Sequence, residues 1–383
     1  MKKLRFIAAA IAVFTLTNSC EDENTSVPSV TTPSNSDQYQ KIVDQFMAAG
    51  AVGVSIAVIS PEGTWSGTGG KADREKNIAM SPDRKLRIGS MTKMFAATTI
   101  LKLQEEGLLN IKDKINKYLP KSITDHIANA NEVTIEQCLN HRSGIRNYLQ
   151  DISAGVFDGS IANYSAAQTL SLIYDKPADD PIGSGYYSNS NYLLLSLIIT
   201  KVTGKSSYEV VKQKIINPLG LLDTSASTLL PEKLTRSYYT EDPAGNSLND
   251  VTQIDNNGIG GQDALDGGMI STASDVTRFV EALITEKLLS PASMQQLETF
   301  VDNDPTRLEP DLKYNKQYGL GLMKLETDQG VALGHDGHVF GFGGRAYYFP
   351  KQKTTVCILL NTWSPKVVAV LNAKATLNLF FKN

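Results

Sequence analysis

Residues that build metal sites and disulfide frameworks are scarce in this sequence. It has three cysteines and four histidines among 383 residues, in no spacing typical of a metal site, so we expect no bound metal. The net charge is small as well, because 37 lysines and arginines nearly balance 40 aspartates and glutamates. This balance gives no reason to expect a nucleic-acid partner. The apolar stretches at 6–16 and 192–202 are shorter than the roughly 20 residues of a membrane-spanning helix. The remaining composition, 41% hydrophobic, is that of a globular chain forming one large domain or two closely packed ones.

The first residues have the pattern of an export signal. Lys2, Lys3 and Arg5 precede the apolar stretch 6–16, and a short polar segment then leads to Cys20. This arrangement resembles a bacterial lipoprotein signal, in which residues 1–19 are removed and Cys20 is lipidated. Ordinary cleavage nearby, releasing a free exported protein, is the alternative. We therefore predict an exported lipoprotein of the cell envelope, in the periplasm or at the cell surface, whose lipid anchor is its only membrane contact.

Residues 20–37 are rich in Ser, Thr, Pro and Asn, a composition that predicts a flexible tether because it cannot bury enough apolar surface to fold. The folded domain is expected over 38–383. Its two cysteines, Cys138 and Cys357, each lie in an apparent helix or strand and are predicted to be small core residues rather than a disulfide.

Hydrophobic patterns predict strands and helices at both ends of the folded domain and mainly helices between them. The expected strands are 52–60, 64–69, 318–325, 342–350 and 354–361, and the expected helices include 39–49, 90–106, 192–202, 273–284 and 367–381. One antiparallel sheet assembled from both chain ends, with flanking helices and an inserted all-helical lobe, accounts for this order, which makes the fold class α+β. The α/β lobe then comprises 38–114 and 265–383, and the helical lobe 115–264. A cleft between the lobes is the expected site.

A serine and a lysine lie one helical turn apart at the start of the helix predicted from residue 90. The segment is Ile88-Gly89-Ser90-Met91-Thr92-Lys93. A serine hydroxyl needs a neighbouring base to become a good nucleophile, and a lysine in a partly desolvated cleft loses part of its preference for the charged form. The helix N-terminus favours developing negative charge. The motif by itself is weak, because short motifs of this kind also occur by chance on surface helices.

Two further motifs carry groups that could serve the same chemistry. Tyr187-Ser188-Asn189 follows a loop signal, and a phenol can pass a proton to a leaving group while an amide holds a substrate carbonyl. The second, His335-Asp336-Gly337-His338, lacks the carboxylate or cysteine partners of a metal site and opens no helix that could bind phosphate. We interpret it as an edge strand in which Gly337 lets a substrate backbone approach and a strand N–H contributes to an oxyanion hole.

The order and spacing of these three motifs resemble those of the penicillin-recognising serine hydrolases, the superfamily of D-Ala-D-Ala carboxypeptidases and class C beta-lactamases. The resemblance covers nearly everything from Tyr39 to the C-terminus and is greatest for secreted carboxypeptidases that have a His-x-Gly third motif. It extends to four other segments, Thr134–Gly144, Asn217–Gly220, Gly267–Thr272 and Tyr318–Gly321.

The resemblance implies a role for each motif residue. Ser90 attacks a carbonyl and forms an acyl-enzyme, Lys93 and Tyr187 share the base role, and Tyr187 protonates the leaving amine. The order in which those two take the proton is left open by the sequence. No cofactor is implied. By the same resemblance, Asn189 holds the acyl side chain of the substrate and His335 supports Tyr187. The backbone N–H groups of Ser90 and His338 form the oxyanion hole.

Two departures from the carboxypeptidase pattern bear on the substrate. Where those enzymes have an arginine that binds the terminal carboxylate, this chain has Met323, followed by Lys324. The third motif has Asp336 and His338 in place of two threonines, and an aspartate repels a carboxylate unless it is paired or protonated. The expected function is D-Ala-D-Ala carboxypeptidase-like hydrolysis of cell-wall peptides. The alternatives are a beta-lactamase, an esterase or D-amino-acid amidase, and a surface binding protein without catalysis.

Overall fold

The computed structural model describes residues 34–157, 162–225, 230–245, 247–257, 263–285, 287–302 and 317–381. Cys20, the predicted signal peptide and most of the predicted tether lie outside these ranges. The folded part begins with helix α1 (Ser36–Ala48), near the residue at which the sequence predicted a helix.

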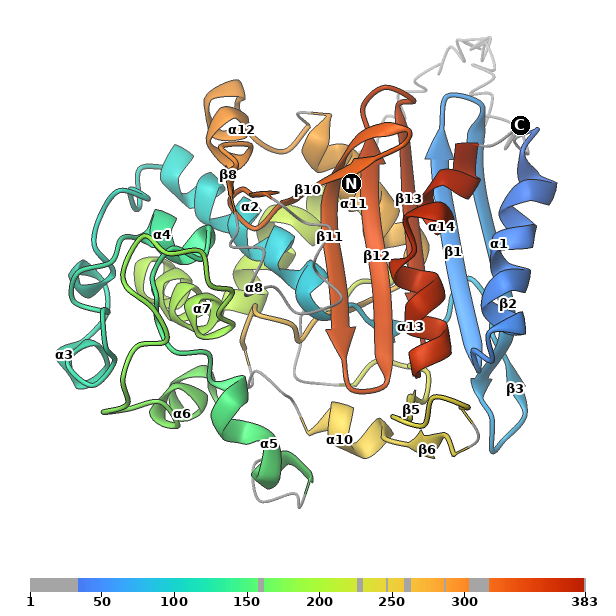
Figure 1. Cartoon of the computed structure of the whole chain (residues 1–383). Coiled ribbons are helices and arrows are strands. Elements are labelled where there is room, and N and C mark those ends of the chain that lie inside the picture. Colours follow the sequence, from blue (N-terminus) through green and yellow to red (C-terminus); the bar gives the residue numbers. More distant parts are fainter. Residues whose placement is uncertain are drawn as a thin grey trace, which may run out of the picture.

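A nine-stranded sheet forms the centre of the molecule (Figure 1), in the order β3-β2-β1-β13-β12-β11-β10-β9-β8. Strands from the start of the chain therefore pair with strands from its end, and β1 lies antiparallel to both β2 and β13. Alternating and continuous runs of β-branched and aromatic residues account for the long central strands. The strands are β1 (Gly53–Ser60), β2 (Gly63–Asp73), β3 (Ile78–Ala79), β8 (Val301–Asp302), β9 (Gln317–Tyr318), β10 (Met323–Thr327), β11 (Gly330–Val339), β12 (Phe342–Phe349) and β13 (Thr354–Leu360).

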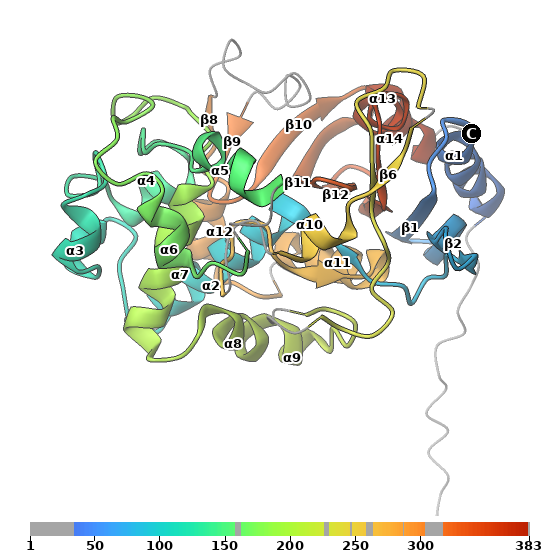
Figure 2. The same ribbon diagram turned by 90° about the horizontal axis from the view of Figure 1, so that it is seen from below.

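Helices cover both faces of this sheet, and Figure 2 shows them as separate layers. One face carries α1 together with α13 (Pro365–Asn372) and α14 (Lys374–Asn378). The other face carries α11 (Ala273–Ile284), which packs on β1, β12 and β13. Helix α2 (Thr92–Glu105) lies beside α11, and Phe95 of α2 stacks on Phe279 of α11 with ring centroids 3.6 Å apart.

Most of the remaining helices form a lobe beside the sheet, seen at the left of Figure 1. Its central helix, α7, has nine buried residues and ends at Gly204 in the left-handed conformation, which glycine adopts at little cost. The helices of this lobe are α3 (Lys121–Thr124), α4 (Ile135–Leu139), α5 (Leu149–Phe157), α6 (Ala166–Ser171), α7 (Ser190–Thr203), α8 (Ser207–Val211) and α9 (Asn217–Leu219). Helix α10 (Thr252–Asn256) lies below the sheet in Figure 1, and α12 (Pro291–Leu297) packs on α2. The α+β class and the sheet built from both chain ends are confirmed.

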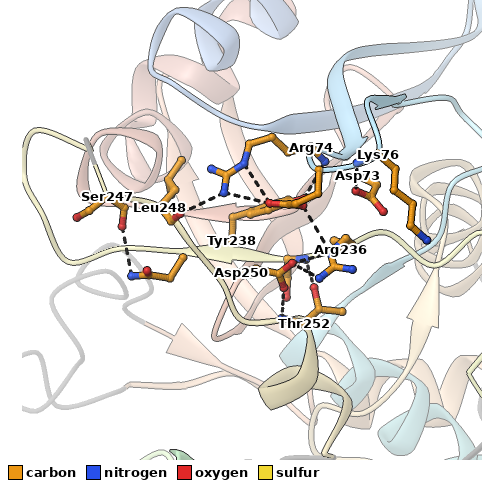
Figure 3. A network of polar contacts seen from close by, with 12 residues as sticks. Asp73, Arg74, Lys76, Arg236, Tyr238, Ser247, Leu248, Asp250 and Thr252 are labelled. Atoms are coloured by element: carbon orange, nitrogen blue, oxygen red, sulfur yellow. Dashed lines mark hydrogen bonds and ion pairs between the residues drawn. The ribbon is translucent and has the colours of Figure 1, made fainter.

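The segment 115–264 is not helical throughout, which corrects the expected all-helical insertion. Strands β5 (Tyr238–Tyr239) and β6 (Asn249–Asp250) pair with each other, and β5 pairs with β14 (Thr362–Trp363) near the C-terminus. Polar contacts then tie this small sheet to the residue after β2 (Figure 3): the Arg74 backbone N–H donates to the Tyr238 hydroxyl at 2.8 Å, and the Arg74 side chain donates to the Leu248 carbonyl at 3.3 Å. Strands this short carry too little periodicity to be recognised in a sequence.

Three expected elements are interrupted in the structure. The helix predicted from residue 90 begins with a 3₁₀ turn, η1 (Gly89–Met91), before α2. The strand predicted over 318–325 is divided into β9 and β10 around Gly321, which has a φ of +69°. The terminal helix predicted over 367–381 breaks at Ala373, whose backbone is extended, into α13, α14 and a 3₁₀ turn, η5 (Leu379–Phe381).

Apolar side chains fill both sides of the sheet. Cys138 in α4 and Cys357 in β13 are buried in the apolar core as free thiols, as predicted. In the part of the chain that the structure describes, none of the helices is both long and apolar enough to cross a bilayer.

Candidate active site

A pocket lies where the sheet meets the helical lobe. Its walls come from the Ser90 turn, the start of α5, the Tyr186–Asn189 loop, Asp266 and Gly267, β11, and the end of α13. Seven of the eight motif residues proposed from the sequence line it, and the eighth, Lys93, lies directly behind Ser90. The fold thus gathers groups that are separated by up to 248 positions in the chain, as expected for a cleft between two lobes.

Ser90 and Lys93 are within hydrogen-bonding distance of each other. Ser90 lies in the 3₁₀ turn and Lys93 in the first turn of α2, which puts both on the same face, with Lys93 Nζ 2.9 Å from Ser90 Oγ. Lys93 Nζ also donates to Asn189 Oδ1 at 2.7 Å and to the backbone carbonyl of Asp266. Three acceptors therefore fix the lysine beside the serine.

Burial changes the protonation of Lys93. Its side chain has no exposed surface, and this desolvation lowers its pKa to about 7, although the nearby Asp266 carboxylate acts in the opposite direction. The aromatic rings of Tyr187 and Tyr192 lie 4.9 and 5.4 Å from Nζ. A substantial fraction of Lys93 is consequently a neutral amine at neutral pH, which can accept the serine proton.

Tyr187 is the second group in contact with the nucleophile. Its hydroxyl is close enough to Ser90 for the serine to lower the pKa of Tyr187, and its ring packs on His141 with centroids 4.1 Å apart. Burial raises the pKa of Tyr187 well above its usual value, and the Ser90 contact opposes this only in part. The phenol therefore retains its proton at neutral pH.

Strand β11 approaches the serine turn closely. A Cβ on Gly337 would lie 2.0 Å from the Ile88 carbonyl oxygen, and a Cβ on Gly89 would lie 2.4 Å from the His338 nitrogen. The sequence predicted that Gly337 makes room for a substrate backbone; the structure shows that it makes room for the turn that carries Ser90. Strand β10 pairs only with residues 330–334 of β11, so the half of β11 that faces the pocket is an edge among the described strands.

The His338 side chain stacks on the ring of Trp363, with ring centroids 3.5 Å apart.

His335 is bonded to a residue other than the one expected. Its Nε2 lies 2.8 Å from the Tyr318 hydroxyl and its Nδ1 lies 2.5 Å from the Asp336 carbonyl oxygen, whereas its ring centroid is 6.4 Å from that of Tyr187. Burial lowers the pKa of His335 to about 4, so the imidazole is neutral. Its contact with Tyr187 runs by way of Tyr318, whose ring meets Tyr187 edge-on at 6.0 Å.

Asp336 is paired within the protein. Arg345 on β12 donates to its two oxygens at 2.8 and 3.1 Å, and the Tyr347 hydroxyl donates at 3.0 Å. Burial by itself raises the pKa of Asp336, but the Arg345 charge and these hydrogen bonds outweigh it and keep the pKa below its usual value. The aspartate is therefore ionised and held in place.

Sequence reasoning missed several residues of this site. The Asp266 carboxylate is fully buried, which raises its pKa, and it accepts a hydrogen bond from Tyr148 at 2.6 Å. Tyr318 and His141 pack around Tyr187. Asp266 immediately precedes the Gly267–Gly268 segment, which the resemblance had already singled out; that neighbourhood is the one signal by which it could have been found. In the described residues, no group of three or more His, Cys, Asp or Glu side chains could hold a metal.

Comparison with known proteins places this arrangement in a family. The family described as Beta-lactamase matches residues 39–379. Protein flp of Staphylococcus aureus (strain N315) is 26% identical over 343 residues, which are 88% of this chain and 66% of that protein. Putative penicillin-binding protein PbpX of Bacillus subtilis (strain 168) is 28% identical over 267 residues, 69% of this chain and 62% of that protein. The chain thus spans just under two thirds of the length of these relatives.

Among solved structures, a D-stereospecific amidohydrolase from Streptomyces sp. superposes with a TM-score of 0.73 at 26% identity, covering 88% of this chain and 98% of that one. A D-amino acid amidase from Ochrobactrum anthropi SV3 reaches a TM-score of 0.75 at 24% identity, covering 90% and 97%, which is a likeness of fold. The serine turn, the buried lysine and the match over residues 39–379 agree. This chain belongs to the beta-lactamase family, within the superfamily of penicillin-recognising serine hydrolases.

Proposed function

We propose that the protein hydrolyses amide bonds through an acyl-enzyme on Ser90. The observation that carries this proposal is the 2.9 Å contact between Ser90 Oγ and the Nζ of Lys93, a fully buried lysine whose desolvation lowers its pKa to about 7. A neutral amine at that position can take the serine proton as the hydroxyl attacks a carbonyl.

The remaining groups suit the later steps of the same reaction. The oxyanion of the tetrahedral intermediate would lie between the backbone N–H groups of Ser90 and His338, where the serine turn meets β11. Tyr187 is protonated because burial raises its pKa, and it lies close to Ser90, so it is positioned to give its proton to the leaving amine. Lys93 would then return the serine proton to Tyr187. A water molecule repeats the sequence to release the acid.

Two specific classes of amide substrate are compatible with this chemistry. D-Ala-D-Ala-terminated cell-wall peptides are the substrate expected from the motifs, and the penicillin-binding relatives support this class. D-Amino-acid amides are the second, and the D-stereospecific amidohydrolase, at 26% identity, supports it. Both contain an amide that Ser90 would open, so the same acylation test applies to either.

The first experiment is intact-mass analysis of protein lacking residues 1–20 after incubation with benzylpenicillin and, separately, with an uncharged fluorophosphonate. We expect at least the fluorophosphonate to add one adduct to the wild type and none to Ser90→Ala, because only an activated serine reacts. A wild-type protein that stays unmodified by both reagents would contradict the proposal and favour a binding protein without catalysis.

The acylation rate should fall as the pH is lowered through about 7. Lys93 has a lowered pKa of about 7, so its neutral, proton-accepting form is lost below that pH. The check is the pH dependence of kcat/KM, or of the rate of fluorophosphonate labelling, between pH 5 and 9. A rate that stays constant down to pH 5 would remove Lys93 from the base role.

Asp266→Asn should move this acid limb to lower pH. The Asp266 carboxylate is the group that raises the Lys93 pKa against desolvation, and an amide of the same size removes its charge while leaving the backbone carbonyl that binds Lys93 in place. The midpoint of the pH profile measures the effect. An unmoved midpoint would mean that Asp266 is uncharged in the wild type.

Export and lipid attachment at Cys20 are also proposals, supported by the sequence pattern of residues 1–20. The mass of the mature N-terminal peptide from membrane and soluble fractions tests them.

A further inference from the structure

The pocket has an unusual charge for a site expected to hold a substrate carboxylate. Among the described residues that line it there is no lysine or arginine, whereas two aspartates, Asp266 and Asp336, do line it. Lys93 lies behind Ser90 and is engaged by Asn189 and the Asp266 carbonyl. His335, which also lines the pocket, is neutral because burial lowers its pKa to about 4.

The fold brings the two departures from the carboxypeptidase pattern together in one wall. Tyr347 on β12 donates its hydroxyl to Asp336 at 3.0 Å and also contacts the Met323 sulfur at 3.8 Å. Met323, Asp336 and Leu371 all line the pocket. We define the wall as these three residues together with Arg345 and Tyr347, which lie behind Asp336. The resemblance places recognition of a terminal carboxylate at its Met323 and Asp336 positions.

The one arginine in this wall is occupied. Arg345 gives Nε and Nη2 to Asp336 and Nη1 to the Leu371 carbonyl oxygen at 2.8 Å. Its side chain is 2% exposed, whereas that of Asp336 is 14% exposed. The part of the ion pair that reaches the pocket is therefore the carboxylate, which attracts hydrogen-bond donors and repels anions.

The neighbouring cation points elsewhere. Lys324 follows Met323 on β10, where successive side chains alternate between faces. Its Nζ donates to Gln317 at 3.0 Å and lies 5.5 Å from the centre of the Phe300 ring, and Lys324 is not among the residues lining the pocket. It is not placed to replace the missing arginine.

We propose that the wall formed by Met323, Asp336, Arg345, Tyr347 and Leu371 selects substrates whose leaving group is uncharged or donates hydrogen bonds, such as a carboxamide or a simple amine, and rejects a free carboxylate. This inference rests on the proposed acyl-enzyme function and narrows its substrate class to amides and carboxamide-terminated peptides. D-Ala-D-Ala with a free C-terminus is then a poor substrate.

The test compares two acetylated peptides ending in D-Ala-D-Ala that differ only in a C-terminal carboxylate or carboxamide. Cleavage is followed as kcat/KM, and binding as protection of Ser90 from the uncharged fluorophosphonate, which reports a preference even without turnover. We expect the carboxamide to be preferred by about tenfold or more, since like charges placed together weaken binding substantially. Equal preference, preference for the carboxylate, or protection by neither peptide overturns the proposal.

Variants locate the selectivity in this wall. Met323→Lys adds a cation without breaking the Asp336–Arg345 pair, and Asp336→Asn removes the anion; each should move the ratio of the two kcat/KM values toward the carboxylate by about tenfold. Met323→Leu is the matched neutral control and should leave the ratio unchanged. An unchanged ratio in both charge variants, with melting temperatures near that of the wild type, overturns the assignment to this wall. Failure of the fluorophosphonate to label wild-type Ser90 would instead count against the proposed function itself.

Discussion

Lys93→Ala is expected to lower the rate of Ser90 acylation by a factor of about 10²–10⁴, the range typical of losing a general base. The variant removes the only amine in hydrogen-bonding contact with Ser90 Oγ among the described residues. Tyr187 cannot take over, because burial keeps its phenol protonated. Stopped-flow or mass-based measurement of acylation by the fluorophosphonate gives the rate directly.

The fold should survive this change. The charge of the fully buried Lys93 carries a desolvation cost that its removal relieves. The buried Asp266 carboxylate loses a favourable charge nearby but keeps its hydrogen bond from Tyr148. Lys102→Ala is the matched control on the same helix. That lysine donates to the Leu288 carbonyl at 2.7 Å, far from the site, and its loss should leave the acylation rate unchanged. Near-normal acylation by the Lys93 variant would assign the base role to another group.

Gly337→Ala should impair both folding and acylation. The added methyl group would lie 2.0 Å from the Ile88 carbonyl oxygen and 2.9 Å from the Met91 side chain, so either β11 or the serine turn must move. Overpacking of this kind costs about 1–3 kcal/mol of the free energy of unfolding. A displacement of about 1 Å between Ser90 and the His338 N–H can reduce the rate by about 10².

The control for this substitution is Gly267→Ala in the same pocket. A Cβ there would come no closer than 3.7 Å to any other atom, the nearest being the Gly89 carbonyl carbon, which is an ordinary contact. Its melting temperature should match that of the wild type, whereas that of Gly337→Ala should be lower. Equal melting temperatures and equal acylation rates for the two variants would mean that β11 is not held against the serine turn.

These expectations share a physical basis in the packing of the serine turn between β11 and α7. Lys93 is a usable base because aromatic and backbone groups exclude water from it while Asn189 and the Asp266 carbonyl hold it in place. The same burial keeps Tyr187 protonated and His335 neutral. One dry environment therefore sets the protonation states of three groups, two of which would act in opposite directions in the reaction.

The sequence by itself determined the parts of this protein that depend on local pattern. Period-two and period-3.6 runs of apolar residues located β1, β12, β13, α7 and α11 within one or two residues, and turn residues separated them. The Ser90 and Lys93 spacing placed both groups on one helical face, since residues three apart are neighbours on a helix. Combined with the Tyr187 and His335 motifs, that spacing indicated the family and the lobes between which the pocket lies.

Only the tertiary structure shows how deeply Lys93 is buried beside Ser90, what Asp336 binds and why Gly337 is a glycine. Each answer depends on contacts between distant segments: the burial of Lys93 beneath Asn189 and Asp266, the pairing of Asp336 with Arg345 across β11 and β12, and the approach of β11 to Ile88. A sequence pattern records the side chains available, but a pKa depends on how much water is excluded and on which charge lies nearby. Those quantities are fixed when the chain ends and the helical lobe pack together, and so the protonation states and the charge of the pocket had to be read from the folded molecule.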